Sequence, residues 1–247
     1  MSDVVRIFIG SSANGEDADI EIAYENSIRE NCSRDVDIVW MRQTNDSDSF
    51  WGGWQTPRWS TPFSGYRWAI PEYCKFQGRA IYTDCDMINY RDMADLIDTD
   101  LQDKPVAARR GSRFGGHEFC VMVFDCEAFE QHSLPVKRMK SIAESHHRMI
   151  NKFSGKDNMV MSLNRKWNCL DGEDLNLKDV WQLHFTNMAT QPWHPGWYTG
   201  EIQPHPRADV AQAFQDAFNA AIANGYDNEA LRSELQQDIV NYNIIGK

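Results

Sequence analysis

Short apolar runs alternate with helical patterns in the first part of the chain. Residues 4–9 are β-branched or aromatic except for Arg6, and the run stops at a Gly-Ser-Ser-Ala-Asn-Gly stretch that begins at Gly10, which predicts a buried strand followed by a loop. From Asp19 the apolar positions recur at helical spacing, and Asp17 and Asp19 supply N-cap chemistry. Residues 36–40 predict a second strand. The order strand, helix, strand indicates an α/β fold with a parallel or mixed sheet covered by helices.

The middle of the chain continues this pattern after an irregular segment. Residues 45–62 are polar and broken by glycine and proline, but they contain Trp51, Trp54 and Trp59, which argues against plain disorder. Further strands are predicted at residues 80–83, 106–109, 120–124 and 180–184. Further helices are predicted at residues 63–74 (interrupted at Pro71), 93–97, 136–151 and 157–163.

The character of the sequence changes at Pro206. Residues 208–223 place apolar side chains on one stripe and end at Asn-Gly, and residues 229–242 repeat the pattern. The polar face of this helical pair carries mostly Asp, Gln and Asn, whereas a membrane-surface helix would carry Lys and Arg. We therefore predict one domain over residues 1–205 and a C-terminal helical extension over residues 206–247. The extension packs on the sheet or forms a subunit contact, and the second case would make the protein a homo-oligomer.

Composition places the chain among globular proteins and excludes some partners. Of its 247 residues, 42% are hydrophobic and 25% are charged. The formal net charge is −11, and the Lys and Arg residues form no dense cluster. A nucleic-acid coat or a polybasic membrane anchor is therefore not expected. A small anionic ligand in a local pocket remains compatible with this charge.

The cysteines and the N-terminus indicate a cellular location. The six cysteines are scattered and form no Cys-x-x-Cys pair, which is typical of reduced thiols in an intracellular protein. Cys120 lies in an apolar run, where a buried thiol is more common than a zinc ligand. The chain begins without a signal-peptide pattern, and no apolar run reaches the roughly 18 residues that span a bilayer. The sequence therefore predicts a cytoplasmic protein without a transmembrane segment.

Two carboxylates follow the apolar run at residues 80–83. Asp84 and Asp86, separated by Cys85, lie at the end of a predicted strand, where open α/β sheets place ligand sites. Because the chain turns there, both carboxylates can bind one Mg²⁺ or Mn²⁺ ion, and such an ion commonly bridges to substrate phosphates. The triplet alone is weak evidence, because Asp-x-Asp occurs by chance in any acidic chain and a solvated turn explains it more simply.

A histidine ends another apolar run almost a hundred residues later. His184 follows residues 180–183 and can offer an imidazole nitrogen to the same metal. Two oxygen donors and one nitrogen donor suit Mn²⁺ better than Ca²⁺. The sequence therefore predicts a metal site formed by Asp84, Asp86 and His184.

The order of these motifs resembles that of the GT-A fold glycosyltransferases, in particular glycosyltransferase family 8, which includes glycogenin and bacterial lipopolysaccharide galactosyl- and glucosyltransferases. The resemblance covers roughly residues 4–197. Residues 81–88 are similar to the family's Asp-x-Asp strand, and residues 121–125 to its next apolar strand. Residues 157–164 are similar to its Asp-Gln helix, and residues 184–193 to its His-x-x-Gly-x-x-Lys-Pro-Trp signature. The resemblance implies a GT-A type fold with a mixed, mostly parallel sheet flanked by helices.

The resemblance also implies roles for individual residues. It assigns the nucleotide to the end of the first strand, at Ile9, Gly10 and Ser11. It assigns the diphosphate to Arg67 and to the Asp84-Cys85-Asp86 turn. It places Asp157 and Asn158 near the anomeric carbon as catalytic residues together with Arg67, although Asp157 would also serve simply as a helix N-cap.

Three features depart from the family pattern, and one of them is Asn187, which stands where the His signature has glycine. The turn that contacts the donor sugar is Asn-Ala-Gly or Asn-Ser-Gly in the family, whereas this chain has Glu118-Phe119-Cys120, so the sugar specificity is not carried over. Gln191 stands where the signature has lysine, which removes a positive charge near the diphosphate. The residues that could supply that charge instead are Arg67, Arg109, Arg110 and Arg113.

The resemblance implies transfer of a hexose from UDP-glucose or UDP-galactose to a glycan, lipid-linked or protein acceptor, with Mn²⁺ or Mg²⁺ and with retention of configuration. Two alternatives stay open. A haloacid-dehalogenase-like phosphatase also has Asp-x-Asp after an apolar strand, although usually after its first strand. A sugar- or nucleotide-binding protein without catalysis would be consistent with Glu118 and Gln191. The loop tryptophans would stack on an acceptor sugar or pack into the core.

Overall fold

A six-stranded sheet forms the centre of the computed structural model, which describes residues 4–111, 116–174 and 176–244. The strand order is β2-β1-β3-β6-β5-β7, and only β6 runs antiparallel to the other five. The strands of this sheet are β1 (Val4–Gly10), β2 (Asp35–Met41), β3 (Arg79–Asp84), β5 (Val106–Arg110), β6 (His117–Asp125) and β7 (Val160–Leu163). The predicted α/β architecture with a mostly parallel sheet is therefore confirmed.

A smaller sheet of three strands lies beside the first. Its order is β4-β9-β8, formed by β4 (Met87–Asn89), β8 (Cys169–Leu170) and β9 (Gln182–His184). Met87 pairs with His184 across β4 and β9, so the chain that leaves β3 returns at once beside the strand that carries the histidine. This pairing brings the Asp84-Cys85-Asp86 turn next to the end of β9.

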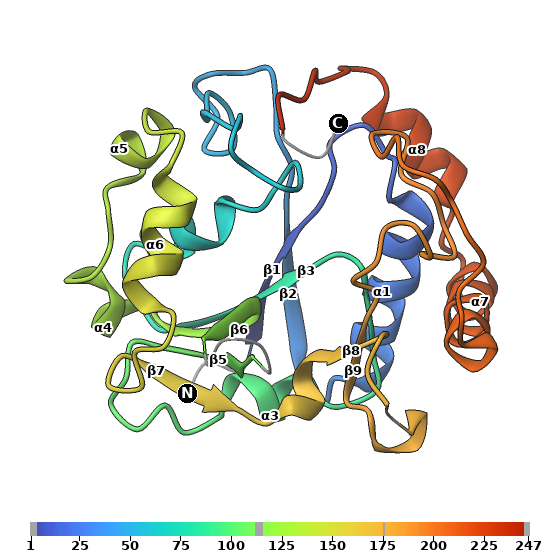
Figure 1. Ribbon diagram of the computed structural model, residues 1–247, viewed down its shortest axis with the longest axis horizontal. Helices are drawn as coiled ribbons and strands as arrows, with labels where there is room; N and C mark the ends of the chain where they lie inside the picture. Colours follow the sequence, from blue (N-terminus) through green and yellow to red (C-terminus); the bar gives the residue numbers. More distant parts are fainter. Residues whose placement is uncertain (1–3, 112–115, 175, 245–247) are drawn as a thin grey trace.

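Helices cover both sides of the large sheet (Figure 1). The chain forms α1 (Ala18–Asn31), α2 (Ile70–Tyr73), α3 (Met93–Ile97), α4 (Cys126–Glu130), α5 (Val136–Lys140), α6 (Ser145–Phe153), α7 (Ala208–Ala223) and α8 (Asn228–Leu235). In Figure 1, α1, α7 and α8 lie on one side, and α4, α5 and α6 lie on the other. Helix α7 packs on α1 through a small apolar cluster that includes Ile20, Val210 and Phe214. None of the helices within the described ranges has the length and apolarity needed to cross a bilayer.

Three predicted helices differ in the structure. Residues 157–163 were expected to be helical, but Val160–Leu163 is strand β7, because Gly155 adopts a positive φ and the apolar residues after it pair with β5. The predicted helix at 136–151 is two helices, α5 and α6, and Ser141 Oγ donates to a backbone carbonyl at the break. The last helix ends at Leu235, well short of residue 242.

The tryptophan-rich segment at residues 45–62 packs into the core. Trp51, Trp54 and Trp59 are all buried, and each ring lies within 5.3 Å of the Tyr66 ring, measured between centroids. Such edge-to-face aromatic contacts stabilise a cluster beyond the area they bury. Of the two interpretations of these tryptophans, core packing therefore describes all three.

The C-terminal segment returns to the loop that follows β1 (Figure 1). The Tyr242 hydroxyl accepts hydrogen bonds from the backbone N–H groups of Ala13 at 2.6 Å and Asn14 at 3.2 Å. It donates to Glu16 Oε2 at 3.0 Å. Val240 and Ile244 on either side are buried. This one hydroxyl therefore satisfies two backbone donors of a loop more than two hundred residues away in the sequence.

Replacing Tyr242 by phenylalanine should lower the free energy of unfolding by about 1–3 kcal/mol, because it leaves the buried Ala13 N–H without its acceptor, while the Asn14 N–H keeps Glu16 Oε2. Urea denaturation of both proteins measures the difference. The matched control is Tyr90→Phe, an exposed tyrosine whose change should stay within about 0.5 kcal/mol. Equal losses in the two variants would contradict a pinning role for the Tyr242 hydroxyl.

Candidate active site

A cavity of about 380 Å³ opens at the carboxyl ends of β1 and β3. Gly10, the last residue of β1, lies in register with Asp84, the last residue of β3, so the two strands end side by side. Ligand sites of open α/β sheets are found at this edge. The cavity brings together six of the residues predicted from the sequence: Arg67, Asp84, Cys85, Asp86, His184 and Gln191.

Asp84 is held by two buried partners. Arg67 Nη2 donates to Asp84 Oδ1 at 2.9 Å, and the Tyr82 hydroxyl donates to the same oxygen. The Arg67 guanidinium also lies over the Tyr82 ring, 4.5 Å from its centroid. Both charged side chains are nearly inaccessible to solvent, so each is needed to offset the desolvation of the other. The carboxylate is therefore fixed in direction at the mouth of the cavity.

Asp86 and His184 face each other across the turn. Asp86 Oδ1 lies 3.2 Å from His184 Nε2 and accepts no hydrogen bond from any residue that the structure describes. Asn168 Oδ1 lies 2.8 Å from the other ring nitrogen, Nδ1. An amide oxygen can only accept, so Nδ1 carries a proton. Nε2 then faces the Asp86 carboxylate with a lone pair in the neutral ring or with a second N–H in the charged ring.

Two buried acceptors at this distance require a positive charge between them. A proton or a metal ion would remove the repulsion of the two lone pairs. Burial lowers the pKa of His184, but the adjacent Asp86 carboxylate more than offsets it, so that pKa is raised. Burial also raises the pKa of Asp86. A ring nitrogen oriented by an amide on its far side is the usual arrangement for a metal-binding histidine.

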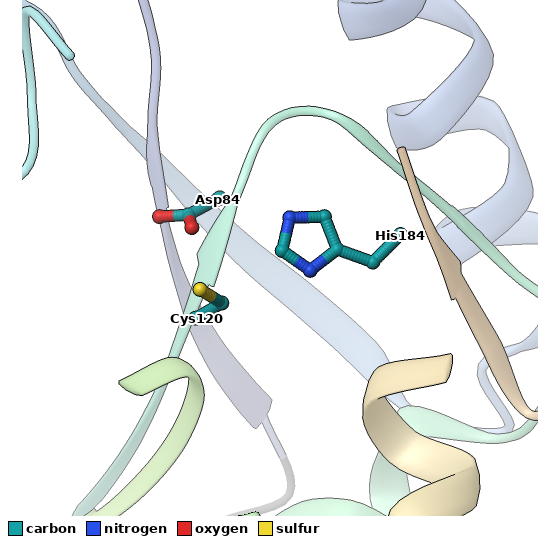
Figure 2. A group of neighbouring side chains, drawn as sticks. All are labelled: Asp84, Cys120 and His184. Atoms are coloured by element: carbon teal, nitrogen blue, oxygen red, sulfur yellow. The ribbon is translucent and has the colours of Figure 1, made fainter. Parts of the chain in front are cut away.

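Cys120 adds a thiol to this group. Figure 2 shows the His184 ring reaching from β9 towards Asp84 on β3 and Cys120 on β6. One ligand atom from each of the three side chains lies within 4.8 Å of the other two. Burial holds the pKa of the Cys120 thiol well above its ordinary value, so without a metal it is protonated. The apolar run around Cys120 predicts its burial, but its approach to Asp84 and His184 depends on strand pairing that the sequence does not show.

The donor set fits a divalent cation. The ligand atoms that lie close enough together to share one ion come from Asp84, Cys120 and His184. Asp86, predicted as a third ligand, lies against His184 instead, and its Oδ1 has no hydrogen-bond partner among the described residues. Carboxylate oxygen suits Mg²⁺ and Mn²⁺, whereas imidazole nitrogen and thiolate sulfur favour ions softer than Ca²⁺. Gln191 Nε2 orients the second Asp86 oxygen from 3.4 Å and donates to the Phe185 carbonyl at 2.9 Å.

Asp17 is a cavity residue that the sequence interpretation missed. It occupies the N-cap position of α1 but makes no capping hydrogen bond. Its Oδ1 instead accepts from Trp193 Nε1 at 3.0 Å, and the side chain lines the cavity. Burial raises its pKa from the ordinary 3.8 to about 7. In the sequence, the position of Asp17 before a helix was sufficiently explained by N-capping. No other feature of the sequence indicates that Asp17 lines the cavity.

The two residues predicted near the anomeric carbon lie elsewhere. Asp157 and Asn158 are exposed, in a turn before β7, and neither is among the described residues that line the cavity. Asp157 forms an ion pair with Arg110 and lies 3.8 Å from His117 Nε2. Because residues 157–163 do not form a helix, Asp157 is not a helix N-cap either.

Ile9, Gly10 and Ser11, which were predicted to bind the nucleotide, are buried at the end of β1 and do not line the cavity. The Ser11 hydroxyl donates to Glu21 Oε1, and the Gly10 carbonyl accepts from the Cys85 N–H at 3.0 Å. A Cβ at Gly10 would lie 2.7 Å from the Phe63 ring, so this position requires glycine. Ile9 is completely buried in the core of the sheet.

Most of the candidate cations are already paired. Arg109 forms ion pairs with Glu173 and, at 3.4 Å, with Glu118, and burial raises the pKa of Glu118. Glu118 itself does not line the cavity. Arg110 pairs with Asp157, and Arg113 lies outside the described residues. Of the described candidates for the missing charge, Arg67 alone lines the cavity.

Comparison with known proteins identifies the fold. No protein-family model and no curated protein matches this chain. Among solved structures, the bifunctional glycosyltransferase WbbM superposes with a TM-score of 0.61 at 13% identity, over 96% of this chain and 52% of that one. This chain thus spans about half the length of that structure.

Two further glycosyltransferase structures are similar. The galactosyltransferase LgtC, solved with donor and acceptor sugar analogues, has a TM-score of 0.60 at 14% identity, over 93% of this chain and 100% of that one. The glycosyltransferase GlyE of Streptococcus pneumoniae TIGR4 has a TM-score of 0.60 at 16% identity, over 96% of this chain and 64% of that one. The resemblance to the GT-A fold is therefore confirmed as a resemblance of fold.

Asp17→Asn should change the pH dependence of stability in the metal-free protein. The folded state binds the Asp17 proton more tightly than the unfolded state, so its contribution to stability is complete below pH 3.8 and is lost as the pH rises to about 7. The loss is at most about 1.4 kcal/mol per pH unit. Asparagine keeps the acceptor for Trp193 without the titration, so the variant should gain stability over wild type between pH 5 and pH 8.

Urea denaturation at both pH values, with a chelator present, measures this difference. Asp216→Asn, at an exposed aspartate on α7, is the matched control and should show no comparable gain. The same difference between Asp17→Asn and wild type at pH 5 and pH 8 would contradict the raised pKa of Asp17.

Proposed function

We propose that the protein is a metal-dependent glycosyltransferase that moves a hexose from a nucleotide diphosphate sugar to an acceptor. The observation that carries this proposal is the pair of buried acceptors, Asp86 Oδ1 and His184 Nε2, 3.2 Å apart beside Asp84. The pair lies in a cavity at the carboxyl edge of a GT-A type sheet. A metal ion would neutralise this pair, as would a proton on His184, and the test below separates the two.

The proposed reaction requires stabilisation of a departing diphosphate. A bound Mn²⁺ or Mg²⁺ would supply most of the positive charge that this leaving group needs. Asp84, Asp86 and His184 would hold that ion, and Asn168 would keep the His184 ring in its binding orientation. Arg67 adds a fixed cation at the same edge, although its contacts with Asp84, the Ser64 carbonyl and the Phe119 carbonyl show that it also has a structural role.

The finer assignments rest on the resemblance to glycosyltransferase family 8. It supports UDP-glucose or UDP-galactose as the donor, and Mn²⁺ as the ion, since an imidazole nitrogen belongs to the site. The acceptor would be a glycan, a lipid-linked sugar or a protein. The exposed position of Asp157 and Asn158 gives no support to either as the group beside the anomeric carbon. We propose retention of configuration with the acceptor attacking from the face that the diphosphate leaves.

A screen of nucleotide sugars with Mn²⁺ should show slow hydrolysis of one donor. Asp86→Asn should reduce that rate by about a hundredfold or more, because it removes a ligand from the ion that stabilises the leaving group. Asp179→Asn, at an exposed carboxylate, is the matched control and should keep the wild-type rate. Hydrolysis that continues unchanged with a chelator would refute the metal assignment. Release of phosphate from phosphomonoesters instead would identify a phosphatase, and binding without turnover would identify a binding protein.

The stereochemistry has its own test. Proton NMR of the sugar released during early turnover distinguishes the two anomers by their anomeric coupling. The expected product keeps the donor's α configuration before mutarotation. An inverted product would refute retention while leaving the metal assignment intact.

A further inference from the structure

A buried histidine on the wall of the same cavity has no role in the metal site. His146 lies in the first turn of α6, is 8% exposed and lines the cavity together with Ile150, one turn further along the helix. Within the described part of the chain, its side chain forms a hydrogen bond with Trp68 and none with Asp84, Asp86 or His184. Its neighbour His147 points outward and is exposed.

The hydrogen bonds of His146 fix which nitrogen carries its proton. Trp68 Nε1 lies 3.1 Å from His146 Nδ1, and an indole N–H can only donate, so Nδ1 accepts. The Trp68 ring is itself held between Phe119 and Phe153. A neutral imidazole with an acceptor at Nδ1 has its proton on Nε2. The packing of Trp68 therefore sets the tautomer of His146.

His146 remains neutral in the folded protein. Burial lowers its pKa well below the ordinary 6.5, and the positive charge of Arg67 lowers it further. The ring therefore presents an uncharged N–H group rather than a cation near neutral pH. Arg67 and Asp84, which form an ion pair, line the same cavity as His146.

The ring of His146 lines the cavity, and its Nε2–H group has no hydrogen-bond partner among the described residues. A donor in such a position forms its bond with water or with a ligand oxygen. The cavity wall around it includes apolar surface from Phe119, Ile150 and Trp197. Apolar and aromatic surface with a few neutral donors is suited to a sugar ring, whereas a phosphate would be bound better by a cation.

We propose that His146 Nε2 donates a hydrogen bond to a hydroxyl of the hexosyl group of the donor, and so determines how well the sugar is held. This inference rests on the proposed function, because the hexosyl group is taken to be bonded to a diphosphate at the Arg67–Asp84 edge. His146 is a sugar-binding residue in this proposal and takes no proton in the reaction. It would explain how a turn without the family's Asn-Ala-Gly motif still holds a sugar.

Two substitutions separate the two nitrogens of the ring. His146→Asn places an amide oxygen near the position of Nδ1 and keeps an acceptor for Trp68, but its amide is too short to reach the position of Nε2. His146→Gln places an amide N–H near the position of Nε2 but loses the acceptor at Nδ1. His147→Phe, at the exposed neighbouring residue, is the control for changes on α6.

Calorimetry with Mn²⁺ should compare the dissociation constant of UDP with those of UDP-glucose and UDP-galactose. In His146→Asn the ratio of the UDP-sugar constant to the UDP constant should rise about five- to tenfold, the loss of one neutral hydrogen bond, with the UDP constant unchanged. His146→Gln should restore the wild-type ratio but melt at a lower temperature. His147→Phe should keep both the ratio and the melting temperature.

The outcomes separate the two proposals. If wild type binds neither UDP nor a UDP-sugar, the proposed function fails and this inference fails with it. If wild type binds them and the ratio is the same in His146→Asn, the proposed function stands and the inference is wrong. If UDP and UDP-sugar weaken equally in His146→Asn, the histidine acts on the nucleotide or on the fold, and the inference is also wrong.

Discussion

The buried guanidinium of Arg67 is the point at which three segments of the cavity wall meet. It donates to the Ser64 carbonyl in the loop before α2, to the Phe119 carbonyl on β6, and to Asp84 at the end of β3. These segments are far apart in the sequence. Without the guanidinium, the two carbonyl groups and the carboxylate would be buried without this hydrogen-bond donor. A buried charge costs several kcal/mol unless it is paired and hydrogen-bonded, so the wall and the ion pair depend on each other. The direction of the Asp84 carboxylate follows from this arrangement.

The sequence predicted the parts of the site that lie at strand ends. Asp84, Asp86 and His184 each follow an apolar run, and the rule that ligands gather at the carboxyl edge of an α/β sheet was enough to group them. Asp17, Cys120 and His146 could not be found in this way. Their side chains reach the cavity through strand pairing and helix packing between distant segments. Asp17 and Cys120 also had sufficient local explanations as a helix cap and an apolar thiol.

The errors in the predicted fold have local causes as well. The apolar spacing in residues 157–163 does not distinguish a helical turn from a four-residue strand. Residues 160–163 form a strand because they pair with β5. The tryptophan segment had no periodicity to interpret, although its aromatic content was a sufficient signal for burial around Tyr66. The strongly patterned elements, such as α7, agree with the structure because their apolar stripe matches the surface they cover.

The contact of Tyr242 with Ala13 and Asn14 has a consequence for the order of folding. Ala13 and Tyr242 are 229 residues apart in the sequence. Contacts between such distant residues form slowly and late in folding, because the chain between them must first be brought together. Domains grow from the N-terminus during synthesis at roughly 5–20 residues per second. The loop that follows the very first strand, beside the cavity, therefore reaches its final form only after residue 242 has left the ribosome. A nascent chain could pair β1 with β2 and β3 long before that loop is held in place.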